Sequence, residues 1–171
     1  MKKPLLPLIL CLAFGLGFFV SRLQPNVAAA SPPAMPSSGW TLHIDAFKHF
    51  GPGHPTQVAH HWCKSGLAGG LIECQVYESD ASNARLVEIE TVVPTAVWKT
   101  FSKSEQALWH YHRVEIPLVH ATLPGMPAAQ QKKVVASLME TYGKIWMLWD
   151  PVSTSGGLPT GKPSIVVLRA H

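Results

Sequence analysis

The sequence lacks an uncharged apolar run long enough for a standard membrane-spanning helix. Its one long apolar segment covers residues 5–20, whereas a helix needs about 20 residues to cross a bilayer. Lys2 and Lys3 precede this segment, and three alanines at residues 28–30 follow it. This order is typical of an export signal that is cleaved after small residues. We therefore expect residues 1–30 to be a signal peptide, with an uncleaved membrane anchor as the alternative.

Charged residues are scarce, and no run of lysine and arginine follows the N-terminal segment. Removal of residues 1–30 would take away three basic residues and no acidic one, so the charge would fall from 14 − 10 = +4 to 11 − 10 = +1. A nucleic-acid-binding domain normally carries a basic patch that contacts phosphates. Nucleic acid is therefore not an expected partner.

Cysteine is also rare, with three residues in the whole chain. Cys11 lies in the apolar N-terminal segment, so Cys63 and Cys74 are the only two left after cleavage. An even pair in an exported protein indicates a disulfide. The alternatives for Cys63 are a metal-ligating thiolate, a nucleophile activated by a neighbouring histidine, and an inert buried thiol.

A functional phosphate-binding loop is absent as well. Residues 156–162 fit the spacing Gly-x-x-x-x-Gly-Lys, but Pro163 stands where a hydroxyl residue is required. The segment that follows has the pattern of a strand, so no helix N-terminus would face the phosphate. We therefore expect no cofactor-binding site of this kind.

The remaining chain predicts one α+β domain. Residues 31–39 are rich in proline and serine and form the expected flexible linker, and residues 40–171 form the domain. Periodicity and turn residues predict strands over residues 41–47, 71–78, 85–93, 145–149 and 164–169, and helices over residues 57–64, 94–101, 102–108 and 127–142. Gly143 is expected just beyond the end of the last helix. Strands joined by hairpins, with a few packed helices, give a mainly antiparallel sheet.

Two histidine-rich segments mark the expected functional surface: residues 59–64, with sequence AHHWCK, and residues 108–115, with sequence LWHYHRVE. If residues 57–64 are helical, His60 and Cys63 share a face. If residues 109–115 are extended, His110 and His112 share a face. Imidazole together with thiolate favours zinc or copper.

We therefore predict a zinc or copper site whose ligands are His60, His61, His110 and His112. Glu115 is one residue out of phase with His112, so we expect it to orient a ring without binding the metal.

Two further roles for these histidines stay open, and neither needs a metal. The rings could pack in the core and donate to backbone carbonyls, or they could act as acids and bases. No set of nucleophile, base and orienting residue can be identified, so the sequence predicts no catalytic residues and leaves enzymatic activity undecided. Trp62 and Trp109 stand beside the histidines and could wall a pocket.

The competing functional class is a non-catalytic lipid-interface or protein-interaction module, which would make a membrane or lipid surface its partner. The oligomeric state is not predicted.

Seven short sequence words occur in a characteristic order between residue 57 and residue 163. They are QVAHHWC at 57–63, ECQVYES at 73–79, ARL at 84–86, LWHYH at 108–112 with Glu115, PGMP at 124–127, TYGKIW at 141–146 and LPTGKP at 158–163. The set resembles the oil body-associated protein family, a family with a domain of unknown function in bacteria and seeds. The resemblance implies association with lipid storage bodies for some members and no established reaction. Together with the export signal, it indicates an exported bacterial member in the periplasm or cell envelope.

Overall fold

The computed structural model describes residues 36–47, 56–150 and 158–168. The expected export signal and residues 31–35 of the expected linker lie outside the described residues. Among the residues that are described, no helix has both the length and the apolar character needed to cross a membrane.

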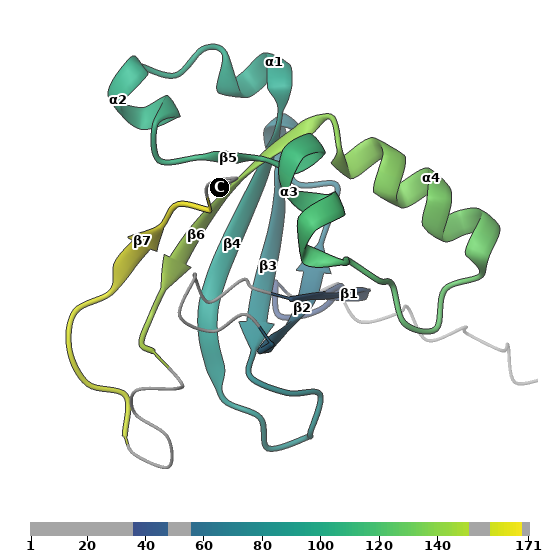
Figure 1. The fold of residues 1–171 in the computed structure, drawn as a ribbon, viewed down its shortest axis with the longest axis vertical. Coiled ribbons are helices and arrows are strands. Elements are labelled where there is room, and N and C mark those ends of the chain that lie inside the picture. The colour runs from purple at the N-terminus through teal and green to yellow at the C-terminus, as the bar shows by residue number, and fades with distance from the viewer. Residues whose placement is uncertain (1–35, 48–55, 151–157, 169–171) are drawn as a thin grey trace, which may run out of the picture. The chain divides into compact units, whose positions relative to one another are not determined.

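The domain is built on a seven-stranded antiparallel sheet (Figure 1). The strands are β1 (Leu42–Phe47), β2 (Val58–Lys64), β3 (Ile72–Tyr77), β4 (Leu86–Pro94), β5 (His110–Tyr111), β6 (Thr141–Met147) and β7 (Ser164–Val166). Their order across the sheet is β1-β2-β3-β4-β6-β5, and β7 also pairs with β6. The helical elements are the 3-10 turn η1 (Ala68–Gly70) and the helices α1 (Thr95–Trp98), α2 (Lys103–Gln106), α3 (His112–Val119) and α4 (Ala128–Leu138). The prediction of an α+β domain with a mainly antiparallel sheet is confirmed.

The sheet has two chemically different faces because side chains alternate along each strand. In β2, Ala59, His61 and Cys63 are buried, whereas the residues between them are partly exposed. The buried set faces α3 and α4, since side chains of both helices line the same cavity as His61 and Cys63. We call this side the helix-covered face and the other side the opposite face.

The prediction of a helix over residues 57–64 is wrong. This segment is strand β2, which pairs with β1 on one side and β3 on the other. Pairing on both sides satisfies its backbone hydrogen bonds, and its burial alternates with a period of two. As a consequence Cys63 shares a face with His61, and not with His60 as a helix would require.

The boundaries around the second histidine-rich segment also differ from the prediction. Only His110 and Tyr111 form a strand, and helix α3 begins at His112 directly after the extended Tyr111. The final helix is shorter than expected, because α4 ends at Leu138. Gly143 is therefore not a residue beyond a helix end but part of strand β6, where it pairs with His110.

Two local predictions are confirmed. The Ser102 hydroxyl accepts a hydrogen bond from the backbone N–H of Glu105 at 3.2 Å and caps α2. Cys63 and Cys74 are directly opposite each other in β2 and β3 and form a disulfide. Because Cys63 is in the disulfide, the structure excludes it as a thiolate ligand or nucleophile.

Candidate functional site

Three imidazoles and two carboxylates meet on the helix-covered face. His61 comes from β2, Glu90 from β4, His110 from β5, and His112 and Glu115 from the first turn of α3. Each is between 3% and 8% exposed. We call these five residues the buried cluster. So many ionisable groups at this depth require compensating charges or ligands, because burial in an apolar interior strongly disfavours isolated charges.

The side chains of the buried cluster converge through the same atom of each ring. Nε2 of His110 lies 2.8 Å from Glu115 Oε2 and 3.3 Å from Glu90 Oε1. Nε2 of His112 lies 3.3 Å from the same Glu90 oxygen. Nε2 of His61 lies 3.5 Å from the other oxygen of Glu90. Glu90 is therefore the centre of the cluster, in contact with all three rings.

The backbone fixes the outer nitrogen of His61, which is the ring nitrogen Nδ1 that faces away from Glu90. His61 Nδ1 lies 3.1 Å from the carbonyl oxygens of both Ile44 and Ala59. Carbonyl oxygens only accept hydrogen bonds, so Nδ1 carries the proton and donates it. In the neutral ring, Nε2 then presents its lone pair toward Glu90. A backbone acceptor that holds the outer nitrogen in this way is characteristic of metal-binding histidines.

The outer nitrogen of His112 is fixed by a hydroxyl group. Its Nδ1 lies 2.8 Å from Thr141 Oγ1, and that hydroxyl donates its single proton to the Leu138 carbonyl at 2.5 Å. Thr141 can therefore only accept from His112, which places the ring proton on Nδ1. A neutral His112 would also turn a lone pair toward Glu90. Lone pairs and a carboxylate repel one another unless a proton or a metal ion lies between them.

Electrostatics at His110 favour a positive charge. Burial lowers the pKa of His110, but the carboxylates of Glu115 and Glu90 outweigh burial and raise the pKa to about 10. Without a metal, this imidazole therefore carries a proton at neutral pH. A divalent cation could replace that proton, because either one offsets the negative charge of the same two carboxylates.

Gly143 keeps the centre of the cluster free of protein atoms. A Cβ at this position would lie 2.5 Å from His110 Nε2 and 2.6 Å from His112 Nε2, and it would also collide with Glu90 Oε1. Gly143 does not have a positive φ, so its backbone does not require glycine. Its role is to leave space between the three donor atoms, which all lie within 4.8 Å of one another.

A cavity of about 50 Å³ adjoins the cluster. Most of its wall is apolar, with contributions from Val119 of α3 and Leu138 of α4, and His61, Glu90 and His112 reach it from the sheet side and from the start of α3. The cavity has room for only a few water molecules or a small ligand. It would give such a ligand direct access to the nitrogen and oxygen atoms of the cluster.

The structure brings together three of the four predicted ligands. His61, His110 and His112 meet, whereas His60 points to the opposite face because neighbouring residues of a strand point to opposite sides. Glu115 contacts Nε2 of His110, on the side of that ring where Glu90 also lies; its role as a residue that orients the ring stays a prediction.

Sequence reasoning missed Glu90. Its signal was present, since Glu88 and Glu90 alternate within a strand that is otherwise rich in β-branched residues. This spacing places two carboxylates on one face of a central strand. Trp62 stacks on His43 and lines a groove on the opposite face, and Trp109 donates to Glu105 of α2. Neither ring is among the residues that line the cavity.

Residues 34–170 match the family model described as "Protein of unknown function (DUF1264)". The chain belongs to this family. It is 34% identical over 147 residues to oil body-associated protein 2B of Zea mays, which covers 86% of this chain and 58% of that protein. It is 32% identical over 126 residues to oil body-associated protein 1B of Arabidopsis thaliana, which covers 73% of this chain and 52% of that protein. The chain thus spans only slightly more than half of these relatives, and no solved structure matches it.

The raised pKa of His110 predicts a specific pH dependence for the metal-free protein. The ring stays protonated through neutral pH and loses its proton near pH 10. The folded-state pKa exceeds the ordinary value of about 6.5. Protonated His110 therefore adds its full contribution to the free energy of unfolding below pH 6.5, and this contribution is lost as pH rises toward 10. Histidine NMR and unfolding measurements across this range test both statements. Glu115→Gln should lower the pKa, and titration of wild-type His110 near pH 6.5 would contradict the proposed charge balance.

Proposed function

We propose that this protein binds a divalent transition-metal ion at the buried cluster. Glu90, His110 and His112 are the ligands, and His61 and Glu115 contact Glu90 and His110 beside them. The observation that carries the proposal is the convergence of inner ring nitrogens and carboxylate oxygens on a space that Gly143 leaves free. Two rings are held by acceptors on their outer nitrogens, which leaves the inner nitrogens available to a cation.

The donor atoms favour zinc. The cluster offers imidazole nitrogen and carboxylate oxygen, and the disulfide takes both cysteines of the described residues. Imidazole and carboxylate donors suit zinc and iron(II), whereas copper(I) prefers sulfur. A zinc ion bound here would act as a Lewis acid and would lower the pKa of a bound water. The adjoining cavity provides the space for such a ligand, but we assign no reaction and no catalytic residue.

Charge balance also supports the proposal. Glu90 and Glu115 bring two negative charges into a buried site, and one divalent ion neutralises both. The alternative is protonation of the imidazoles, which His110 favours in the absence of metal. Metal binding then displaces protons, so the affinity for zinc should increase with pH until the rings no longer compete.

Gly143→Ala is the sharpest test because it changes none of the donor side chains and adds one methyl group that must displace their atoms from the shared centre. We expect the full-length protein, stripped with chelator and then titrated with zinc, to lose one equivalent of tightly bound metal in this variant. The affinity at this site should fall at least about tenfold, the scale expected when the surroundings of a metal site are disturbed. Metal content and histidine NMR provide the measurement.

The matched controls are a double variant and a distant histidine. His110→Ala with His112→Ala should lose the same equivalent as Gly143→Ala, whereas His120→Asn removes an exposed imidazole outside the cluster and should bind as wild type does. Asparagine tolerates the left-handed backbone of residue 120. Retention of full zinc binding by folded Gly143→Ala and by the double variant would overturn the proposal.

A second candidate function is association with a lipid surface. The relatives from Zea mays and Arabidopsis thaliana are named oil body-associated proteins. In this chain, Val114 and Leu118 lie one turn apart on α3 and are 48% and 47% exposed. Two adjacent apolar side chains can insert at an interface, although their area is small for stable binding.

Flotation with phospholipid-coated triacylglycerol droplets tests this candidate. Wild-type protein should float with the droplets, and Val114→Asp with Leu118→Asp should lose at least half of the bound fraction because two charges would enter the apolar contact. Lys132→Asp on exposed α4 is the control for added negative charge. Equal flotation of all three proteins would exclude this face of α3 as the contact.

We also propose that residues 1–30 form an export signal and that the mature protein occupies a bacterial periplasm or cell envelope. The disulfide supports this location, since such bonds persist in oxidising compartments. The intact mass of protein from the envelope fraction should correspond to a chain that starts near Ser31. A full-length reduced protein in the cytoplasm would contradict both cleavage and export.

A further inference from the structure

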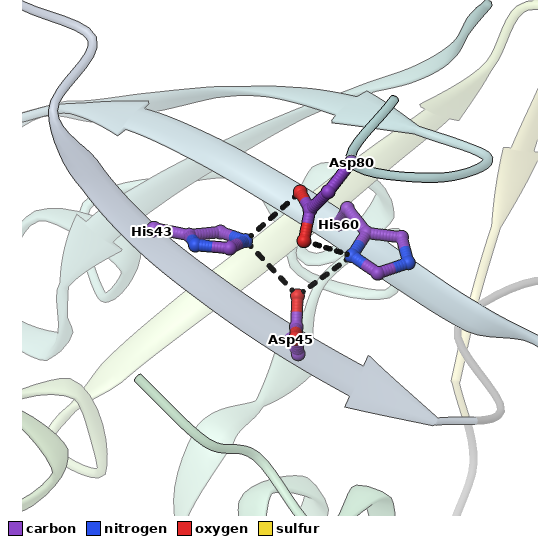
Figure 2. A group of neighbouring side chains, drawn as sticks. All are labelled: His43, Asp45, His60 and Asp80. Atoms are coloured by element: carbon purple, nitrogen blue, oxygen red, sulfur yellow. Dashed lines mark ion pairs between the residues drawn. The ribbon is translucent and has the colours of Figure 1, made fainter. Parts of the chain in front are cut away.

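A second group of ionisable residues lies on the opposite face, at the edge strand of the sheet. His43 and Asp45 come from β1, His60 comes from β2, and Asp80 comes from the turn after β3. Figure 2 shows the two rings and the two carboxylates facing one another around a common centre. We call these four residues the sheet-edge cluster. None of them belongs to the buried cluster.

The four donor atoms form a closed set of short contacts. His43 Nε2 lies 3.1 Å from Asp45 Oδ1 and 3.1 Å from Asp80 Oδ1. His60 Nδ1 lies 2.8 Å from Asp45 Oδ1 and 3.0 Å from Asp80 Oδ2. Each nitrogen therefore lies between two carboxylate groups, and each carboxylate lies between two rings.

The contacts have the separation of metal ligands but not the angles of hydrogen bonds. Within the described part of the chain, His43 Nε2, Asp45 Oδ1 and His60 Nδ1 are buried atoms without a hydrogen-bond partner of acceptable geometry. Donors at about 2.0 Å around a tetrahedral zinc ion are about 3.3 Å apart. The nitrogen–oxygen contacts of 2.8–3.1 Å are close to that value. The four donor atoms are thus arranged as ligands around a common centre and not as hydrogen-bonded pairs.

Strand pairing and stacking hold three of the four side chains in place. Asp45 lies directly opposite His60 in the β1–β2 pair. His43 and Asp45 are two residues apart and therefore share a face. The His43 ring stacks on Trp62 with centroids 4.3 Å apart and planes inclined by 6°. This packing fixes the direction of the His43 ring before any ligand binds.

A separate set of interactions fixes the turn that carries Asp80. The Arg85 guanidinium donates to both carboxylate oxygens of Glu78 at 2.6 Å, across the base of the turn. Arg85 also lies 4.4 Å above the ring of Trp149. A bidentate pair of this kind has a defined geometry. Asp80 is therefore presented to the sheet by an ordered turn.

We propose that the sheet-edge cluster is a second metal site, which binds a zinc-class divalent ion independently of the buried cluster. Two imidazoles and two carboxylates supply four donors and two negative charges. The set contains nitrogen as well as oxygen, which favours zinc over calcium or magnesium. The side chains are 13% to 40% exposed, so the ion can exchange with solvent.

The position of the site suggests access for a further ligand. Asp80 and Trp62 also line an open groove of about 340 Å³, together with Trp40, Gln75 and Tyr77. An ion at the sheet-edge cluster would lie at the margin of this groove. The adjacent residues His60 and His61 would then serve two metal sites on opposite sides of the same strand.

Zinc titration of the full-length, chelator-stripped protein tests the proposal through two variants. Asp80→Asn removes one charged ligand from a partly exposed turn, and His60→Ala removes one imidazole. Each should abolish one equivalent of bound zinc or weaken it at least about tenfold, while the zinc-dependent NMR shifts of His110 and His112 remain as in wild type. Ser82→Ala in the same turn and His120→Asn should leave both equivalents unchanged.

Combination with Gly143→Ala separates this proposal from the proposed function. Gly143→Ala should retain the zinc held by His43 and His60, and Asp80→Asn should retain the zinc held by His110 and His112. If folded Asp80→Asn and His60→Ala bind as much zinc as wild type with unchanged affinity, the sheet-edge cluster is only a network of ion pairs. That result would overturn this inference whatever the outcome at the buried cluster.

Discussion

The carboxylate of Glu90 lies in the middle of the sheet, on the face that α3 and α4 cover, and the surrounding structure compensates its charge. Three ring nitrogens lie within 3.5 Å of its two oxygens. A charge at this depth is unfavourable unless it is paired or bound to a metal. Because the rings come from β2, β5 and α3, one carboxylate links segments that are distant in the sequence.

The alternation of side chains along β2 explains why the histidines divide into two groups. His60 and His61 are adjacent, so they point to opposite sides of the sheet. His61 lies on the apolar, helix-covered side, where other protein groups must compensate the buried charges. His60 lies beside Asp45 and Asp80, where solvent also stabilises the charges. The doublet therefore supplies one imidazole to each of two clusters with different accessibility.

Most of the sheet could be predicted from the sequence, because β3, β4 and the hairpin between them combine β-branched strands with a clear turn. The β2 segment could not, since its histidines are compatible with a helix until pairing with β1 and β3 is known. The end of α4 at Leu138 could not be predicted from the sequence either. Tyr142 continues the apolar helical spacing of Leu138 and Met139, yet pairing with β4 and β5 makes residues 141–147 the strand β6.

The candidate site was predictable in part for similar reasons. His110 and His112 could be placed together from their spacing, although the chain changes from strand to helix between them. The roles of Glu90 and Gly143 depend on cross-strand register, which one sequence does not contain. Gly143 in particular has the sequence signature of a helix end, and only its position opposite His110 shows that a Cβ there would collide with His110, His112 and Glu90.

The most direct test of metal binding at the buried cluster is a crystal structure of the zinc-loaded protein with anomalous scattering measured on both sides of the zinc absorption edge. We predict a zinc peak beside Gly143, bonded to Glu90, His110 and His112. Absence of that peak at saturating zinc, with protonated rings hydrogen-bonded to the two carboxylates instead, would show that the buried cluster is a structural ion-pair network and not a metal site.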